Sequence, residues 1–271
     1  MKTITKVFFS LILALCTIFS VYSQENGQQL VIPLSNPDKP GLLDINVMSG
    51  TIKVTGYAGK DVIINVSTDQ RKYEQGDESR DGLKRIPNNS IGLNAKEYNN
   101  TVKVNSENWN KKVDLNIQVP KAFDLTLKGI NDGEILVENV TGEIDAGHVN
   151  GEISLINISG TALANTTNGD VKVTFLSVNE NSPMAFSSFN GNVDITFPAS
   201  LKATVKMKSD QGELYTDFDM VMRKTTPTVD SKKESGEYKI SMDGWVTGDV
   251  NGGGPEISFK TFNGDIILRK K

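Results

Sequence analysis

The clearest pattern in the chain is a nine-residue repeat in which alternating polar and apolar positions follow each glycine. The residue directly after each glycine is polar, the second and fourth are apolar, and the seventh is apolar in all units but one. The repeat glycines are Gly133, Gly142, Gly151, Gly160 and Gly169. Alternation with a period of two over such short segments predicts β-strands with one buried side.

Two kinds of unit alternate, so one full repeat consists of two successive nine-residue units. Asn or Asp precedes the glycine in one kind, and Thr or Ser in the other; the fourth position after it is large in the first kind and Ala in the second. A short strand cannot bury its apolar side alone, but coils stacked ~4.8 Å apart share one core. We therefore predict a parallel β-solenoid, right-handed by the crossover rule. Antiparallel hairpins are the alternative, since Asn-Gly and Asp-Gly turns also favour them.

Looser copies of the pattern extend the prediction to most of the chain. Further turn glycines at Gly191, Gly212 and Gly264 follow Asn or Gln, with coils of about 18–22 residues. We expect one all-β domain over residues 41–271, with a polar, extended leader before it at 24–40. Two stretches poor in apolar residues, 68–91 and 222–237, are expected to be exposed inserts.

Residues 1–23 have the features of a cleaved signal peptide. Lys2 and Lys6 precede an apolar run from Val7 to Val21, and Ser23 supplies a small residue before the expected cleavage point. That run is shorter than the ~20 residues of a membrane-spanning helix. We therefore expect an exported mature chain without a transmembrane span, located in the periplasm, at the cell surface or in the medium. The single cysteine, Cys16, lies within this segment.

The composition of the chain excludes several kinds of functional site. One Cys and one His exclude an intramolecular disulfide and any site that needs two imidazoles. The formal charge of −4 becomes −6 without the two lysines of the signal segment, so the overall field does not attract nucleic acid or anionic lipid. The chain contains no P-loop, G-x-S-x-G or HExxH motif, and no arginine lies in the regular repeat. These absences favour a protein that is not an enzyme.

Surface carboxylates and one tryptophan are the candidate binding residues. Glu134, Glu152 and Asp170 should form a ladder on one side of the stack, which either collects Ca²⁺ or keeps the surface solvated. With one glycine per unit, the ladder does not match the glycine-rich Ca²⁺ repeats, and we expect no cofactor. Trp245, in the glycine-rich segment 244–254, either stacks on a sugar ring or partner, or caps the last coil.

The remaining polar and aromatic residues have structural interpretations. Asn150 and Asn168 are one full repeat apart, and stacked amides form ladders. His148 is expected at a bend beside Gly147, without a second His or Cys to complete a zinc site. Tyr98 and Trp109 flank an Asn-rich turn and are expected to be half-buried.

The G-[ED]-[IV]-x-[VL] strands and the Asn-Gly turns resemble the bacterial "putative adhesin" repeat family. The resemblance is strongest over residues 131–197. It implies a β-solenoid in the cell envelope with a binding, adhesin-like or scaffolding role, and it supplies no catalytic residues. The expected partner is an envelope protein or polysaccharide. A carbohydrate-active β-helix enzyme and a periplasmic envelope-stress sensor acting with a membrane partner are the alternatives.

Overall fold

Strands form almost all of the regular structure in the computed structural model of the protein. It describes residues 28–68, 92–106, 111–179, 181–224, 228–231, 238–241 and 244–271, and these contain no helix. The all-β prediction is confirmed for these residues. The predicted signal peptide 1–23 with Cys16, the part of the first insert at 69–91, and Trp109 lie outside the described residues, as do 225–227 and 232–237 of the second insert.

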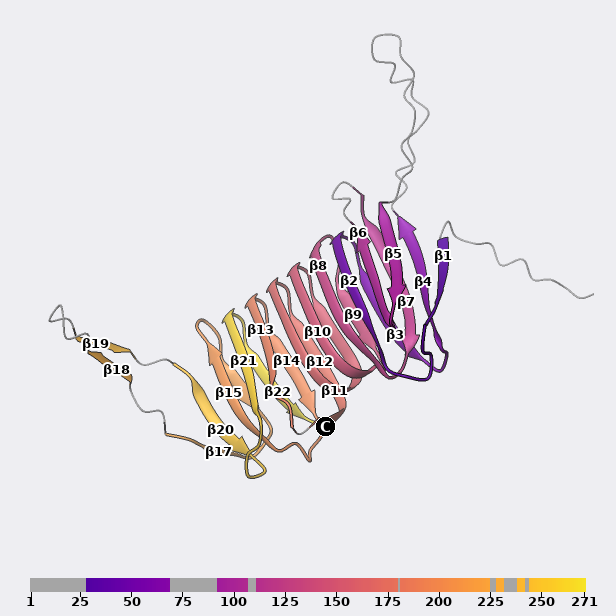
Figure 1. Ribbon diagram of the computed structural model, residues 1–271. Coiled ribbons are helices and arrows are strands. Elements are labelled where there is room, and N and C mark those ends of the chain that lie inside the picture. Colours follow the sequence, from indigo (N-terminus) through magenta and orange to yellow (C-terminus); the bar gives the residue numbers. More distant parts are fainter. Residues whose placement is uncertain are drawn as a thin grey trace, which may run out of the picture.

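Two rows of hydrogen-bonded strands make up an elongated, curved stack with the N-terminal strands at one end (Figure 1). Layer 1 contains, in spatial order, β1 (Gln28–Pro33), β4 (Asp61–Thr68), β7 (Val113–Pro120), β3 (Ile52–Tyr57), β9 (Ile135–Glu138), the first part of β11 (Ile153–Asn168), β12 (Val171–Val178), β14 (Val193–Phe197), β22 (Ile266–Lys270) and β16 (Leu214–Thr216).

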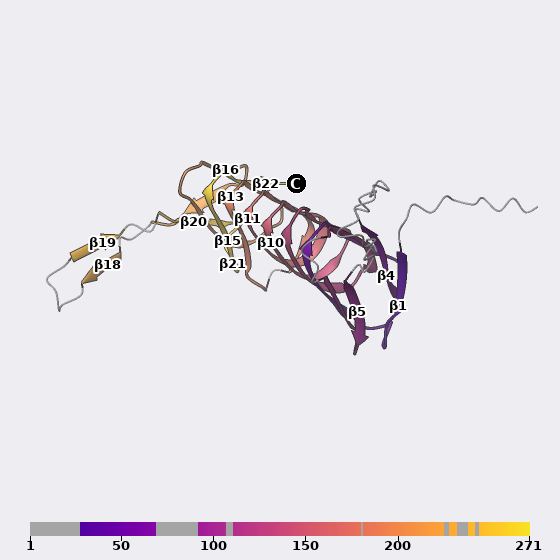
Figure 2. The same ribbon diagram turned by 90° about the horizontal axis from the view of Figure 1, so that it is seen from above.

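Layer 2 faces layer 1 across the core (Figure 2). Its spatial order is β5 (Leu93–Tyr98), β6 (Thr101–Ser106), β2 (Gly41–Ser49), β8 (Phe123–Asn131), β10 (Thr141–Asn150), the second part of β11, β13 (Met184–Asn190), β21 (Glu256–Asn263), β15 (Ala203–Ser209), β20 (Val246–Val250) and β17 (Met220–Met222). A separate hairpin of β18 (Thr228–Ser231) and β19 (Tyr238–Ser241) extends beyond the C-terminal end (Figure 1).

The regular repeat produces parallel pairs in register. Ile153 pairs with Ile135 on one side and with Val171 on the other, each one full repeat away. Because side chains alternate across a strand, these three point into the core, where each is fully buried. Further along the stack the core is aromatic: Phe175 and Phe197 are stacked with ring centroids 4.8 Å apart.

Chain order and spatial order differ at both ends of the stack. Strands β2 and β3 lie between the β6–β7 coil and the β8–β9 coil, although β6 and β7 come later in the chain. Likewise, the last two strands, β21 and β22, lie between β13–β14 and β15–β16. The outermost strands β1, β4, β5, β17 and β20 pair antiparallel. The first and last coils are therefore interior members of the stack.

Three local predictions are wrong. The apolar residues at the seventh position of the repeat, expected in the core, are not uniformly buried, because Val149 and Leu176 are 40% and 52% exposed. Tyr98 is not half-buried but 75% exposed, on β5, the last strand at this end of layer 2 among the described residues. His148 is not at a bend; it lies inside β10 with its side chain buried, since strand alternation turns it inward when Val149 turns outward.

Candidate binding surface

One corner of the stack is built from glycines that lie directly over one another. A Cβ added to any of them would come within 2.0–2.4 Å of a backbone atom of the next coil, so the coils approach too closely for any side chain. The members, in spatial order, are Gly50, Gly133, Gly151, Gly169, Gly191, Gly264 and Gly212. Six of the eight sequence-predicted turn glycines belong to this ladder. The other two, Gly142 and Gly160, lie within strands β10 and β11 and stack on each other away from the ladder.

A ladder of asparagine amides runs beside the glycines on the solvent side. Each Nδ2 donates to the Oδ1 of the neighbouring Asn at 2.7–2.8 Å. Its members are Asn131, Asn150, Asn168, Asn190 and Asn263. On the core side of the same corner, hydroxyls of Thr166, Ser188 and Thr261 donate to carbonyls of the ladder glycines in the preceding coil. The coils are thus cross-linked on both sides of the glycines.

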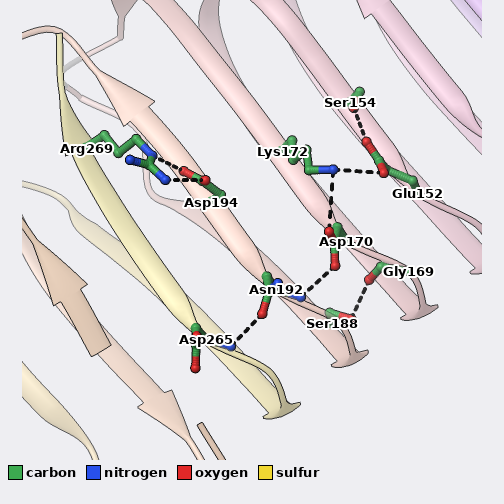
Figure 3. Close-up of polar contacts among 10 residues, drawn as sticks. All are labelled: Glu152, Ser154, Gly169, Asp170, Lys172, Ser188, Asn192, Asp194, Asp265 and Arg269. Carbon is green, nitrogen blue, oxygen red and sulfur yellow. Dashed lines mark hydrogen bonds and ion pairs between the residues drawn. The ribbon is translucent and has the colours of Figure 1, made fainter. Parts of the chain in front are cut away.

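The predicted carboxylates occur as neighbours in layer 1, and two of them, Glu152 and Asp170, are paired with other groups (Figure 3). Lys172 Nζ lies 3.0 Å from Glu152 Oε2 and 3.4 Å from Asp170 Oδ2, and Ser154 donates to Glu152. Asp170 also accepts the backbone N–H of Asn192. These contacts raise the pKa of Lys172, mainly through its bond to Glu152.

This arrangement does not favour the Ca²⁺ alternative. A lysine ammonium between two carboxylates occupies the oxygens that a hard cation would need. Within the described ranges, no three His, Cys, Asp or Glu side chains come together in a group that could hold a metal ion. Farther along the same layer, Arg269 makes a bidentate pair with Asp194, at 2.7 and 2.9 Å (Figure 3).

Layer 2 exposes an aromatic pair that sequence reasoning missed. Phe189 and Phe262 lie opposite each other on β13 and β21, with ring centroids 4.9 Å apart and planes 2° from parallel. They are 50% and 39% exposed. The available sequence signal was the repeated Phe-Asn-Gly tripeptide at 189–191 and 262–264, whose members the structure places side by side.

Trp245 lies on the same layer at the C-terminal end of the stack. It directly precedes β20, is half-buried, and has Lys206 Nζ 4.8 Å from its ring centroid. Farther along β20, Asp249 accepts two bonds from Arg223, at 2.8 and 2.9 Å. The structure thus separates Trp245 from Glu134, Glu152 and Asp170, which are on the other layer.

His148 is the one buried ionisable group at the corner among the described residues. Its ring fills the space left by Gly129 on β8, and neither ring nitrogen has a hydrogen-bond partner in the described part of the chain. The stacked positions in the following strands are Thr166 and Ser188. Burial lowers the pKa of His148 below its ordinary value of 6.5, because a dry site disfavours the imidazolium.

We expect stability to fall as the pH drops below about 6.5, because the unfolded chain then binds a proton that the folded chain excludes. Above that pH both states carry neutral His148, and its contribution is fully present. Urea midpoints measured at pH 7.5 and 5.5 test this. His148→Thr, which places the residue of the next strand at this position, should reduce the pH dependence. If the parent protein and the His148→Thr variant lost equal stability between pH 7.5 and 5.5, the pH dependence would come from the surface carboxylates and not from His148.

The described residues contain no helix long and apolar enough to cross a membrane. A family model described as Toastrack DUF4097 matches residues 14–251. No curated protein matches the chain.

Two solved structures resemble the fold. One is a "putative cell adhesion protein" from Clostridium sporogenes, 11% identical, with 90% of this chain and 100% of that chain covered and a TM-score of 0.51. The other is a "putative adhesin" from Bacteroides fragilis, 14% identical, with 92% and 98% covered and a TM-score of 0.42. At this identity the first shows likeness of fold alone. The family match over most of the chain confirms the family resemblance predicted from the repeat motifs.

Proposed function

The chain belongs to the Toastrack DUF4097 family, and we propose that it is an exported, noncatalytic protein with a binding, adhesin-like or scaffolding role at the bacterial cell envelope. The observation that carries the proposal is the state of the surface acids. In layer 1, Lys172 pairs with Glu152 and Asp170, and Arg269 pairs with Asp194. Asp170 and Asp265 also accept backbone N–H groups of the next coil. Catalysis by an acid pair needs two carboxyls that converge on one bond, whereas these acids form a row that stabilises the stack.

The proposed role follows from the shape. Stacked strands form long, flat outer faces, and solenoid proteins use such extended surfaces for contact with partners. The fold likeness to one structure described as a "putative cell adhesion protein" supports the same role for this chain. We also propose that the coils wind in the right-handed sense, since parallel strands joined by crossover connections do so almost always.

Export is tested by comparing the full chain with a matched chain that lacks residues 1–23. We expect the full chain to be recovered from the periplasm, surface or medium, and to begin near Gln24. The shortened chain should stay in the cytoplasm. Recovery of both proteins in the cytoplasm would contradict export.

Binding is tested by sedimenting the purified protein with the envelope fraction of the bacterium that encodes it. We expect the protein in the pellet with envelope and in the supernatant without it. Incubation with a polysaccharide panel should produce no new reducing ends or unsaturated products. Their appearance would support the carbohydrate-active alternative, and capture of one inner-membrane protein alone would support the sensor alternative.

A further inference from the structure

The outer face of layer 2 carries a cluster of cations and aromatic rings near its C-terminal end. It extends over four adjacent strands, β13, β21, β15 and β20, and so over ~14 Å at the usual strand spacing. We call it the Lys–aromatic patch, and define it as Phe189, Phe262, Lys206, Lys208, Lys260 and Trp245. Every member except Trp245 lies on a strand.

Two lysines of the patch face each other across neighbouring strands, which lowers the stability of the sheet. Lys208 and Lys260 are direct partners in the parallel pair β15–β21, and like charges that face each other across strands destabilise a sheet. Asp210 offsets part of this repulsion, with its Oδ1 3.6 Å from Lys208 Nζ. Lys260 is exposed, and no acidic side chain of the described residues pairs with it. An anionic ligand would relieve the repulsion that the protein leaves in place.

The aromatic members give the patch an apolar side. Phe189 and Phe262 are both exposed to solvent and support each other by stacking. At the opposite side of the lysines, the Trp245 ring is held beneath Lys206, where the cation–π contact orients both groups. Exposed aromatic rings next to cations suit a ligand that has both apolar C–H faces and negative charges.

The asparagine ladder borders the patch and adds hydrogen-bonding capacity. Asn190 and Asn263 directly follow the two phenylalanines, and both are exposed. Asn190 donates one N–H to Asn168 and accepts one from Asn263. An amide has two N–H donors and two acceptor lone pairs, so one donor and one lone pair of Asn190 remain for a ligand. A hydroxyl group both donates and accepts hydrogen bonds, so the hydroxyls of a sugar can use both.

We propose that the Lys–aromatic patch binds an acidic polysaccharide, a chain of pyranose rings that carry carboxylates. The rings contact Phe189 and Phe262, the hydroxyls bond the amides of Asn190 and Asn263, and the carboxylates lie at Lys208 and Lys260. The charge match is local, because the whole chain has a formal charge of −4. This proposal rests on the binding role proposed above, and names the class of ligand.

The test is calorimetric titration of the purified protein with polygalacturonate and with alginate, against dextran as the uncharged probe. We expect both acidic polymers to bind and dextran to bind at least tenfold more weakly. K208Q/K260Q should weaken the acidic polymers about tenfold and reduce the salt dependence of binding. The matched control is K96Q/K128Q, which removes the same charge from exposed positions on β5 and β8, toward the other end of layer 2, and should leave the affinity unchanged.

A second variant separates the aromatic contribution from charge. F189T/F262T places at both positions the residue that occupies the neighbouring stacked position, Thr167, so the fold should be retained. It should lower the affinity several-fold while the salt dependence stays as it is. Near-ultraviolet circular dichroism of each variant checks that the stack is intact.

Several results would overturn the proposal. They are equal binding of dextran, equal effects of the two lysine pairs, and binding of phosphatidylglycerol vesicles in place of the acidic polymers. Sedimentation with envelope but no binding of either acidic polymer would reject the ligand class and leave the proposed function standing. If the protein neither bound the acidic polymers nor sedimented with the envelope fraction, the proposed function itself would be rejected.

Discussion

Gly169→Ala is expected to destabilise the protein by about 3 kcal/mol, because a methyl group has no room in the glycine ladder. The new Cβ would lie 2.3 Å from the carbonyl oxygen of Gly151 and 2.5 Å from its carbon. Both atoms belong to the backbone, so neither yields without moving a coil. Gly169 also has a φ of +149°, where L side chains are strained. Urea unfolding followed by circular dichroism measures the change.

Gly147→Ala is the matched control for this prediction. Gly147 lies in β10, and an added Cβ would be 3.6 Å from its nearest neighbour, the side chain of Asn165. Its backbone is outside the left-handed region. We expect unchanged stability or a gain of about 0.5 kcal/mol, since alanine loses less backbone entropy on folding. If both variants lost the same stability, close approach at the ladder would not explain the glycine period.

The stacking of the coils could be predicted from the spacing of the glycines, because each ladder glycine marks a close contact between two neighbouring coils. Each glycine of the ladder meets the same backbone group one coil away, so one local rule appears many times. The core position represented by Ile135, Ile153 and Val171 follows for the same reason. The burial of His148 could not be predicted in this way. The space for its ring is provided by Gly129, which lies on the preceding strand of layer 2 and is not part of the nine-residue glycine period.

The order of the coils could not be predicted from the repeat. Nothing in the local pattern of 256–270 indicates that this segment lies between β13–β14 and β15–β16, since every coil offers similar apolar edges. Residues that become neighbours there are far apart in the chain: Asn190 and Asn263 are separated by 73 residues.

The same topology explains why the Lys–aromatic patch escaped sequence reasoning. Its members come from 189 to 262, and they meet only because β21 enters between β13 and β15. Of the six, Trp245 alone stood out in the sequence, since a lone tryptophan in a glycine-rich segment is conspicuous. Lysines that alternate with apolar residues, as in β15, are indistinguishable from the solvated side of any strand.

Ile153→Lys is expected to cost more than about 4 kcal/mol, because it places a charge in the dry interior of the regular repeat. Ile153 is fully buried and lies between Ile135 and Val171 in the stack. The acids of this region, Glu152 and Asp170, point outward and are held by Lys172, so no carboxylate is available inside. Thermal unfolding should show a large fall in Tm or no cooperative transition at all.

Ile156→Lys tests whether the location of the charge, rather than its addition, causes the loss. Ile156 lies on the same strand, its side chain is 38% exposed, and its partner on β9 is Glu138. A lysine there faces a carboxylate across the strands, so stability should change by no more than about 0.5 kcal/mol. An Ile153→Lys protein that melts like the parent would show that position 153 reaches solvent, and the stacked arrangement of β9, β11 and β12 would then be wrong.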